Sequence, residues 1–245
     1  MVGGQSNLKI GAIIQARFQS TRLPGKVLMP MPFPDGPPIL GRIAEALRKV
    51  ELIDQIIIAT SRNEENDPIE VFAKKRNISI FRGDENDVQS RFFDLTQTYN
   101  FDHVIRLTGD NPMIDPKYLT EAIRYHIDSD CDYTKTQGLP LGSNFEVIKS
   151  ACLLDRIGKI RTNAEKEHVT YFIANTDLIK KNIIEFNLPN MDVRFTVDYP
   201  QDYAMVSLLC HLTKSSFDLD QITLELAQHN WMKEINLGMT QKKID

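Results

Sequence analysis

The sequence predicts an α/β fold with a mainly parallel, mixed sheet that is flanked by helices on both faces. Two observations support this prediction. Short apolar runs typical of buried strands alternate along the chain with segments whose apolar residues recur at helical spacing. Strands that alternate with helices usually pair in parallel, because the helix returns the chain to the same end of the sheet. The chain has 245 residues and no evident linker, so a single domain over residues 1–245 is expected.

The first half of the chain is expected to hold four strands and four helices. The strands are predicted at residues 8–14, 55–60, 78–81 and 103–107. The helices are predicted at residues 39–50, 68–76, 88–99 and 116–127. Asp67-Pro68 and Asp115-Pro116 each place an N-capping aspartate before a proline, which is typical of a helix start.

The second half is less regular, and about residues 131–190 are expected to form the part that binds the substrate. Residues 131–149 are predicted to form strands around a turn rich in glycine and proline. Helices are predicted at residues 150–160 and 164–175, from Pro200 onward and at 218–230, and further strands at 182–187 and 193–197.

Composition excludes several classes of protein. The formal net charge of −4 argues against a general attraction to nucleic acid or to anionic membranes. No apolar run approaches the ~18 residues that a membrane helix needs. Residues 1–7 lack the basic and apolar regions of a signal peptide, and the three cysteines are widely spaced. We therefore expect a cytoplasmic protein with reduced thiols, with no membrane insertion and no nucleic-acid partner.

The segment after the first predicted strand, residues 15–26, is the most informative. Arg17, Arg22 and Lys26 bring three positive charges within ten residues, and Ser20, Thr21 and Gly25 suit a turning backbone. Open α/β sheets bind ligands at this position, and such a loop can hold a polyphosphate. It is not a P-loop, because Val27 follows Lys26 where serine or threonine is required. A solvated basic loop is the alternative.

Two aspartates follow predicted strands. Asp110 comes after Gly109 at the end of strand 103–107, and Asp198 ends strand 193–197. A carboxylate at the place of Asp110 suits Mg²⁺, which prefers one or two carboxylates together with phosphate oxygens and water. The alternative for Asp110 is an ordinary turn made by Asp-Asn-Pro.

The residues Ile13 to Arg17 and Ser20 to Leu28 resemble the nucleotide-binding signature of the bacterial cytidylyltransferases for surface sugars. These include CMP-KDO synthetase, the acylneuraminate cytidylyltransferases and, most similar, the SpsF-like group of spore coat polysaccharide synthesis. The resemblance implies a nucleotide-diphospho-sugar transferase fold, which is GT-A-like and Rossmann-like. Gln19 departs from it, since the family usually has glycine there.

The resemblance also implies roles for individual residues. Those implied to bind the nucleotide are Gln15, Ala16, Arg17, Ser20, Thr21, Arg22, Lys26, Arg82 and Asp110, among which Arg17, Lys26 and Asp110 would be catalytic. Asp110 and Asp198 would be the metal carboxylates. Arg91, Asn144 and Glu146 would bind the acceptor, although the related pattern has an acid where Asn144 stands.

The activity that the resemblance implies is transfer of CMP from CTP to a sugar acid or a related surface-glycan precursor, with release of pyrophosphate. Mg²⁺ would be the cofactor, CTP and a small acceptor such as a sugar acid or sugar phosphate the partners, and a homodimer the assembly. Two alternatives stay open: a glycosyltransferase of related fold that uses a nucleotide-sugar, and a catalytically weak nucleotide-binding module.

One further acidic segment has features of a metal site. Asp128-Ser129-Asp130 has the DxD spacing of metal-dependent glycosyltransferases and opens like an EF-hand loop. Tyr133 and Leu139 replace the glycine and the final glutamate that an EF-hand requires. A solvated loop between a helix and a strand is therefore expected here.

Overall fold

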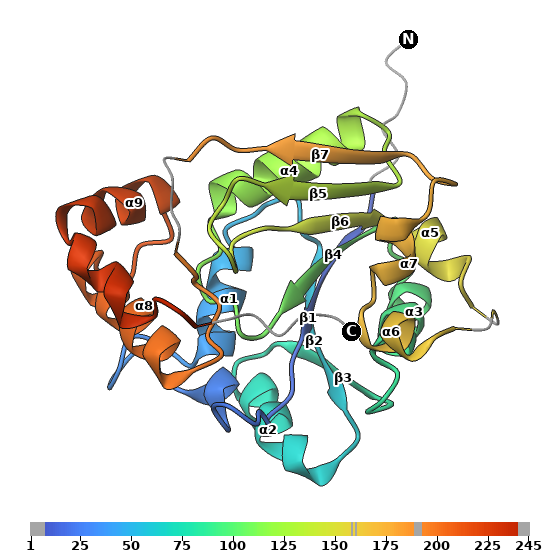
Figure 1. Ribbon diagram of the computed structural model, residues 1–245. Helices are drawn as coiled ribbons and strands as arrows, with labels where there is room; N and C mark the ends of the chain where they lie inside the picture. The colour runs from blue at the N-terminus through green and yellow to red at the C-terminus, as the bar shows by residue number, and fades with distance from the viewer. Residues whose placement is uncertain (1–7, 158, 160, 189–192, 240–245) are drawn as a thin grey trace.

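The computed structural model describes residues 8–157, 159, 161–188 and 193–239, and it has a central sheet with helices on both sides (Figure 1). The strands are β1 Ile10–Gln15, β2 Gln55–Ser61, β3 Ser79–Gly83, β4 His103–Thr108, β5 Tyr133–Gln137, β6 Glu146–Lys149 and β7 Lys181–Glu185. The α-helices are α1 Ile39–Leu47, α2 Asp67–Lys75, α3 Val88–Tyr99, α4 Pro116–Asp128, α5 Ser150–Leu154, α6 Asn163–Glu167, α7 Tyr171–Asn175, α8 Pro200–Leu212 and α9 Leu219–Gln228. Three 3₁₀ helices, η1 Lys26–Leu28, η2 Glu64–Asn66 and η3 Asn230–Ile235, were not predicted.

The seven strands form one mixed sheet in the order β3-β2-β1-β4-β6-β5-β7. The first four in this order run parallel, whereas β6 is antiparallel to both β4 and β5. The register places Gln15 beside Ala59 on one side and beside Thr108 on the other. The carboxyl ends of β1 and β4 therefore lie together, and the segments that follow them start from one edge of the sheet.

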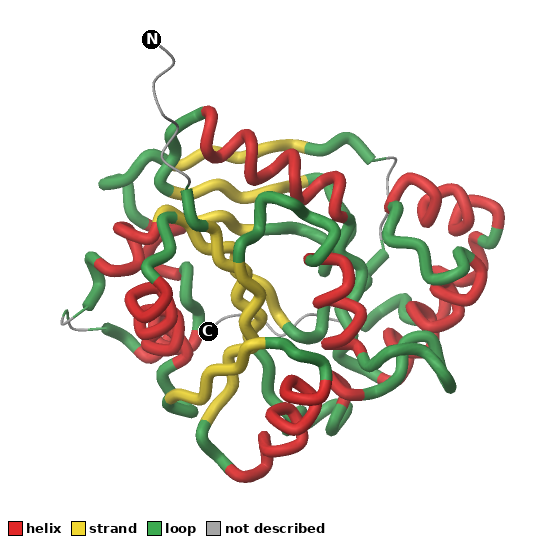
Figure 2. The backbone as a smooth tube through the Cα atoms, turned by 180° about the vertical axis from the view of Figure 1, so that it is seen from behind, coloured by secondary structure: helices red, strands yellow, loops and turns green. Residues whose placement is uncertain are grey.

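Helices lie on both faces of the sheet (Figures 1 and 2), and the sheet separates two apolar cores. Successive residues of a strand point to opposite faces, so Ala12 and Ile14 join the core under α1, α4, α8 and α9, whereas Ile13 joins the core under α3, α5 and α7. Both faces of β1 are buried, which explains why its sequence is a continuous apolar run.

The predicted α/β class is confirmed, and most elements lie within two or three residues of their predicted bounds. Asp115 caps α4 as predicted, with its side chain accepting a hydrogen bond from the Lys117 N–H at 2.8 Å. At α2 the N-cap is Asn66, one residue earlier than predicted. The helix predicted at 164–175 is two short helices, and the helix predicted at 150–160 ends at Leu154 (residues 158 and 160 lie outside the described residues).

The strand predicted at residues 193–197 is wrong. Only an isolated bridge between Arg194 and Leu141 forms there. Backbone N–H groups of this segment donate to carbonyls of loops and not to a neighbouring strand. The Phe195 N–H donates to the Leu141 carbonyl at 2.7 Å and the Val197 N–H to the Asp110 carbonyl at 2.8 Å. This segment therefore crosses the edge of the sheet and ends beside the residue that follows β4.

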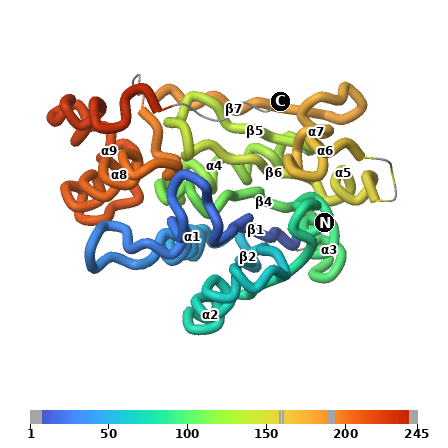
Figure 3. Tube along the Cα trace, turned by 60° about the horizontal axis from the view of Figure 1, so that its bottom comes forward, coloured from blue at the N-terminus to red at the C-terminus, as the bar shows by residue number. Residues whose placement is uncertain are grey.

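The long segment between β1 and α1 packs on α8, and Figure 3 shows the two side by side. The Tyr203 hydroxyl donates to the Pro30 carbonyl, and the Phe33 N–H donates to the Ser207 hydroxyl at 2.8 Å. The segment after β1 is thus fixed against the helix that follows Asp198.

No helix in the described ranges is long and apolar enough to cross a membrane. Residues 1–7, on which the expectation about a signal peptide rests, lie outside those ranges.

Two buried histidines connect β4 to α4. The His103 Nδ1 lies 3.0 Å from the His126 Nε2, and the His126 Nδ1 lies 2.8 Å from the Thr134 hydroxyl. Burial, and then the neighbouring His103, lower the pKa of His126 to about 4. Unfolding returns His126 to its ordinary pKa of about 6.5. Between about pH 6.5 and pH 4, the unfolded chain therefore binds a proton at His126 that the folded chain does not bind.

We predict that the free energy of unfolding is constant above about pH 6.5 and falls by about 2 kcal/mol between pH 7.5 and pH 5 because of His126. Urea unfolding at both values of pH measures this loss. His126→Gln should show a smaller loss, whereas His211→Gln, a change at an exposed histidine, should keep it. An equal loss in all three proteins would contradict the assignment.

Candidate active site

The loop after β1 is shaped by contacts between its two ends. The Phe18 N–H donates to the Asn66 side chain at 2.8 Å, and the Gly25 N–H donates to the Phe18 carbonyl at 2.9 Å. Gly25 has a φ of +71°, in the left-handed region that favours glycine, and it forms the N-cap of η1. The turn at Gly25 directs the next side chain, Lys26, back toward the edge of the sheet.

Asp110 is positioned by a close approach between the ends of β1 and β4. The Gly109 N–H donates to the Gln15 carbonyl at 2.8 Å. A Cβ atom at Gly109 would lie 3.0 Å from the Ala16 Cβ and 3.1 Å from Leu40, so a larger residue would push the loops apart. Glycine at this place lets Asp110 stand directly above the strand ends.

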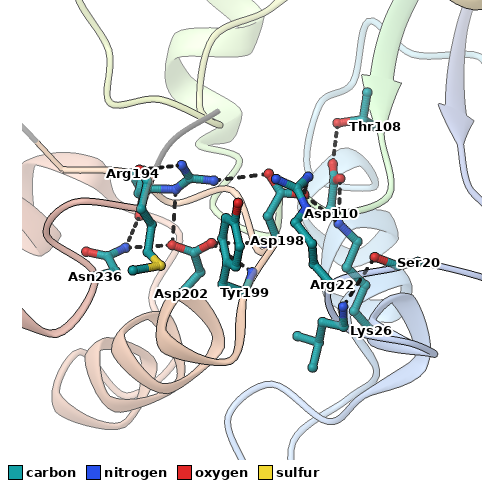
Figure 4. Close-up of polar contacts among 12 residues, drawn as sticks. Ser20, Arg22, Lys26, Thr108, Asp110, Arg194, Asp198, Tyr199, Asp202 and Asn236 are labelled. Atoms are coloured by element: carbon teal, nitrogen blue, oxygen red, sulfur yellow. Dashed lines mark hydrogen bonds and ion pairs between the residues drawn. The ribbon is translucent and has the colours of Figure 1, made fainter. Parts of the chain in front are cut away.

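Lys26 joins the two aspartates that were predicted from the sequence (Figure 4). Its ammonium lies 2.9 Å from the Asp110 Oδ2 and 2.9 Å from the Asp198 Oδ1. The Lys26 side chain is only 7% exposed, so these contacts are shielded from bulk water. The structure therefore brings together a basic residue of the loop after β1 and two acids that are 88 residues apart in the sequence.

Asp198 receives two arginines in addition to Lys26. The Arg22 guanidinium lies 2.7 Å from the Asp198 Oδ1 and 4.7 Å from the centre of the Tyr199 ring. Arg194 lies on the other oxygen, Oδ2, at 3.0 Å. The Asp198 Oδ1 thus contacts residues of the loop after β1, and the Oδ2 contacts Arg194 of its own segment.

The support for Asp198 comes from Asp202, which the sequence predicts to support the turn or the helix start, and from Arg194 and Asn236, which the sequence does not reveal as functional. Asp202, at the start of α8, accepts hydrogen bonds from the backbone N–H groups of Asp198 and Tyr199, both at 3.0 Å. The same carboxylate contacts Arg194 at 3.1 Å and Asn236 at 3.0 Å. Asn236 belongs to the C-terminal segment, and only its tertiary position shows its role.

A second buried residue, Arg42, holds the segment after Asp110. Its guanidinium donates to the Pro112 carbonyl at 3.1 Å and to the Ser215 and Ser216 carbonyls at 3.1 and 2.7 Å. Burial lowers the pKa of Arg42. Its spacing on α1 predicts only a helical residue, so this role also emerges from the tertiary structure.

The neighbouring groups favour the charged forms of Asp110 and Arg22. Burial raises the pKa of Asp110, but the Lys26 ammonium and the Thr108 hydroxyl outweigh burial and bring this pKa below its usual value. Burial lowers the pKa of Arg22, while the Tyr199 hydroxyl and the Asp198 carboxylate outweigh it and raise this pKa. Both shifts favour the charged forms of Asp110 and Arg22.

The other residues of the loop after β1 lie near this site with different exposure. Arg17 and Thr21 are exposed, and Ser20 is buried, with its hydroxyl accepting a hydrogen bond from the Leu23 N–H at 3.5 Å. The Gln15 side-chain oxygen is buried without a partner in the described chain. The side chain of Gln19 is exposed.

Arg82 and Arg91 are engaged elsewhere. Arg82 pairs with Asp67 at 2.7 Å and with Glu70 at 2.6 Å, at the start of α2. Arg91 is buried and donates to the carbonyls of Asp84 and Glu85 at 2.6 and 2.8 Å. The structure does not join either arginine to the Lys26 cluster, which consists of Arg22, Lys26, Asp110 and Asp198. The predicted roles of Arg82 in nucleotide binding and of Arg91 in acceptor binding stay predictions.

Glu146 and Asn144 also have defined partners. Glu146 pairs with Arg106 at 2.7 Å and accepts hydrogen bonds from the hydroxyls of Tyr133 and Thr170. Burial raises the pKa of Glu146, but Arg106 and these hydroxyls bring it below its usual value. Asn144 donates to the Leu139 carbonyl at 3.0 Å and so closes the turn between β5 and β6.

The polar face that holds Glu146 reaches toward the Lys26 cluster. Glu146 lies beside Arg106 in the β4–β6 register, and Thr108 follows two residues further on β4. Thr108 donates to Asp110 at 2.7 Å. Strand β4 thus connects the two predicted sites: its Arg106 contacts the predicted acceptor residue Glu146, and its Thr108 contacts the predicted metal residue Asp110.

The DxD segment lies at the other end of the sheet. Asp130 pairs with Lys149 at 3.2 Å, and Lys149 is beside His103 at the start of β4, whereas Asp110 follows its end. The Asp130 side chain is 87% exposed. The structure agrees with the interpretation of this segment as a solvated loop.

The pair of carboxylates fits a hard divalent cation. No group of three or more histidine, cysteine or acidic side chains in the described part of the chain could hold a metal. Mg²⁺ commonly takes only one or two carboxylates and completes its shell with water and phosphate oxygens. The Lys26 ammonium already places a positive charge between Asp110 and Asp198, so the donor set fits Mg²⁺ bound together with a phosphorylated ligand.

A loop whose Arg22 and Lys26 contact two acids at the carboxyl edge of a mainly parallel sheet is the arrangement of an α/β protein suited to an anionic, phosphate-bearing ligand. Comparison with known proteins narrows this class. The chain belongs to the cytidylyltransferase family, whose sequence model matches residues 11–244. The predicted resemblance is therefore confirmed.

Two relatives cover most of the chain. The spore coat polysaccharide biosynthesis protein SpsF of Bacillus subtilis is 37% identical over 208 residues, which are 80% of this chain and 84% of the relative. An uncharacterized protein of Methanocaldococcus jannaschii is 31% identical over 239 residues, 96% of this chain and 97% of the relative. The 3-deoxy-manno-octulosonate cytidylyltransferase of Pelobacter propionicus is 31% identical over 121 residues, covering 49% of this chain and 46% of the relative.

Solved structures confirm the predicted type of fold. A cytidylyltransferase from Leptospira borgpetersenii has a TM-score of 0.84 at 28% identity and covers 96% of this chain and 100% of its own. The CMP-KDO synthetase solved in complex with CTP has a TM-score of 0.63 at 16% identity, covering 84% of this chain and 99% of its own. The latter supports the fold alone.

We predict that Lys26→Met lowers the free energy of unfolding by about 3 kcal/mol, because it leaves two shielded carboxylates without their shared cation. Denaturant unfolding at pH 7 measures the change. Lys74→Met removes a 70% exposed lysine from its pair with Glu70 and should cost less than about 0.5 kcal/mol. Equal losses in the two variants would show that the Lys26 contacts do not stabilise the fold.

Proposed function

We propose that this protein transfers CMP from CTP to a sugar acid or a related surface-glycan precursor and releases pyrophosphate. The observation that carries the proposal is the Lys26 ammonium between Asp110 and Asp198, beside the loop that follows β1. Membership of the cytidylyltransferase family and the similarity to SpsF support the same reaction. We further propose that the reaction takes place in the cytoplasm.

The loop after β1 would hold the triphosphate. No hydrogen bond among the described residues uses the backbone N–H groups of residues 19–22, so these groups are free to bind phosphate oxygens. Arg22 and Lys26 add positive charge at the same place, and Arg17 of the same loop is exposed. The exchange of a carboxylate partner for a phosphate keeps each cation neutralised.

Asp110 and Asp198 would hold Mg²⁺, which when bound would neutralise charge that develops on the phosphates. Lys26 would then leave the carboxylates and contact the triphosphate. An acceptor oxygen would form a bond to the α-phosphorus in line with the bond to pyrophosphate, which breaks. Catalysis by these side chains would consist of orientation and electrostatic stabilisation, without a covalent enzyme intermediate.

The acceptor would lie along the polar face of β4 and β6. Arg106 and Glu146 form an ion pair there, and the Arg106 Nε is buried without a partner among the described residues. A guanidinium suits the carboxylate of a sugar acid or a phosphate. The resemblance to SpsF, a protein of polysaccharide biosynthesis by its name, supports an acceptor of this class.

We predict that CTP with Mg²⁺ stabilises the protein against heat more than UTP, ATP or GTP does. A ligand at ~100 times its dissociation constant adds ~2.7 kcal/mol to the free energy of unfolding, which a thermal-shift measurement detects readily. Stabilisation by nucleotide-sugars and none by CTP would favour the glycosyltransferase alternative. CTP binding without pyrophosphate release from any sugar acid or sugar phosphate would favour the binding module.

We predict that Asp110→Asn lowers the rate of CTP-dependent pyrophosphate release ~10²-fold or more, because it removes a carboxylate that would hold the Mg²⁺ facing the reacting phosphates. The rate is measured with the acceptor that a screen of sugar acids and sugar phosphates identifies. Asp128→Asn, a change at an exposed acid of the DxD segment, should keep the full rate. A loss confined to Asp128→Asn would move the metal site to that segment.

We also propose that the protein is a homodimer joined through β7. This strand is one edge of the sheet, and its Ile183 is 59% exposed. Antiparallel pairing with a second copy around Ile183 would place Lys181 opposite Glu185 and so match their charges.

Sedimentation is predicted to give a dimer for the natural chain and a monomer for Ile183→Asp. Leu224→Asp, which changes a residue that is 64% exposed on α9, should stay dimeric. A monomeric natural chain would refute the assembly, and a dimeric Ile183→Asp variant would refute its location.

A further inference from the structure

We propose that Thr108 and Arg194 make the site selective for a small octahedral cation, Mg²⁺ or Mn²⁺, over Ca²⁺. Each of them occupies one oxygen of a metal-binding carboxylate and leaves the other oxygen for the cation. This inference rests on the proposed function, which assigns the metal to Asp110 and Asp198.

We call a group that holds one oxygen of a metal-binding carboxylate a cap, and the first cap is Thr108 on Asp110. The Thr108 hydroxyl donates to the Asp110 Oδ1 at 2.7 Å, while the Oδ2 faces the Lys26 ammonium at 2.9 Å. Thr108 is the last residue of β4, and its backbone is fixed by pairing with Gln15 of β1. A hydroxyl held on a strand cannot follow the carboxylate if the latter rotates, so Asp110 is held with its Oδ2 toward Lys26.

The second cap lies on Asp198. The Arg194 guanidinium holds the Asp198 Oδ2 at 3.0 Å, while the Oδ1 receives Lys26 at 2.9 Å and Arg22 at 2.7 Å. Arg22 is 29% exposed and, like Lys26, would pass to the polyphosphate when the cation takes this oxygen. Arg194 is itself fixed: Asp202 binds it at 3.1 Å, and it donates to the Met239 carbonyl at 2.9 Å. Its side chain is 7% exposed, so its release from Asp198 would leave a shielded guanidinium short of a partner.

The two oxygens that face Lys26 meet at one point. The Asp110 Oδ2 and the Asp198 Oδ1 both lie 2.9 Å from the same Lys26 nitrogen. A cation that replaces this ammonium therefore finds one oxygen from each carboxylate, and the caps keep the second oxygens turned away (Figure 4).

One oxygen from each carboxylate matches the needs of Mg²⁺ better than those of Ca²⁺. Mg²⁺ requires a near-ideal octahedron and completes it with water and phosphate oxygens. Ca²⁺ takes six to eight ligands and often binds a carboxylate through both oxygens. Thr108 and Arg194 withhold that second oxygen, so the ion that gains from bidentate binding is disfavoured.

The test compares Mn²⁺, followed by electron paramagnetic resonance, with Ca²⁺ as its competitor, on protein saturated with CTP. The contribution of the nucleotide is common to all variants and cancels between them. In the natural chain Ca²⁺ is expected to bind at least ~10-fold more weakly than Mn²⁺. Thr108→Val keeps the shape of the side chain and removes the donor, and it should improve Ca²⁺ binding relative to Mn²⁺ about tenfold. Thr108→Ser keeps a hydroxyl and should retain the natural ratio.

Arg194→Met removes the cap from Asp198 and should also improve Ca²⁺ binding relative to Mn²⁺. The test therefore stays decisive if one of the two variants does not fold. An unchanged ratio in the folded variants, or equal binding of both ions by the natural chain, overturns this inference while CTP binding still supports the proposed function. Absence of CTP binding refutes the proposed function itself. CTP binding without any protein-bound Mn²⁺ refutes the metal assignment and, with it, the selectivity.

Discussion

The contact of one ammonium with two carboxylates is the interaction on which the site depends. Lys26 brings together a loop after β1, the end of β4 and the start of α8. Asp110 and Asp198 would repel each other in this shielded environment, whereas the Lys26 ammonium between them attracts both carboxylates. The surrounding structure, including the turn at Gly25 and the close approach at Gly109, serves to place these three side chains.

The topology of the sheet explains why the acids can meet at all. Strands β1 and β4 are parallel neighbours, so the segments after them leave from the same edge. The segment before α8 forms no strand, and the hydrogen bond from the Val197 N–H to the Asp110 carbonyl attaches it directly to the residue after β4. The predicted strand at 193–197 failed for this reason: the chain there exchanges sheet pairing for contact with the site.

The sequence was sufficient for the class of fold and for the residues at the ends of strands. Apolar runs and capping signals mark elements locally, and Asp110 follows one such element, β4. Lys26 and Asp198 were singled out by their sequence motifs, since Lys26 lies in a loop and the strand predicted before Asp198 does not form. The supporting residues could not be predicted, because their roles come from distant contacts. Arg194 and Asn236 act through Asp202, and Arg42 acts through carbonyls in two separate loops. Neither residue type nor spacing marks these positions.

The balance of charge shows how an arrangement that stabilises the fold can also serve a reaction. Asp110, Asp198 and Asp202 are matched by Arg22, Lys26 and Arg194, and the last of these is fixed by buried partners. Arg22 is 29% exposed, and its contact and that of Lys26 fall on oxygens that face the loop after β1. When a divalent cation and a polyphosphate enter together, the cation can take the carboxylates and the anion can take Arg22 and Lys26. Every charge then keeps a partner, so the ligands can enter this shielded site without leaving an isolated charge behind.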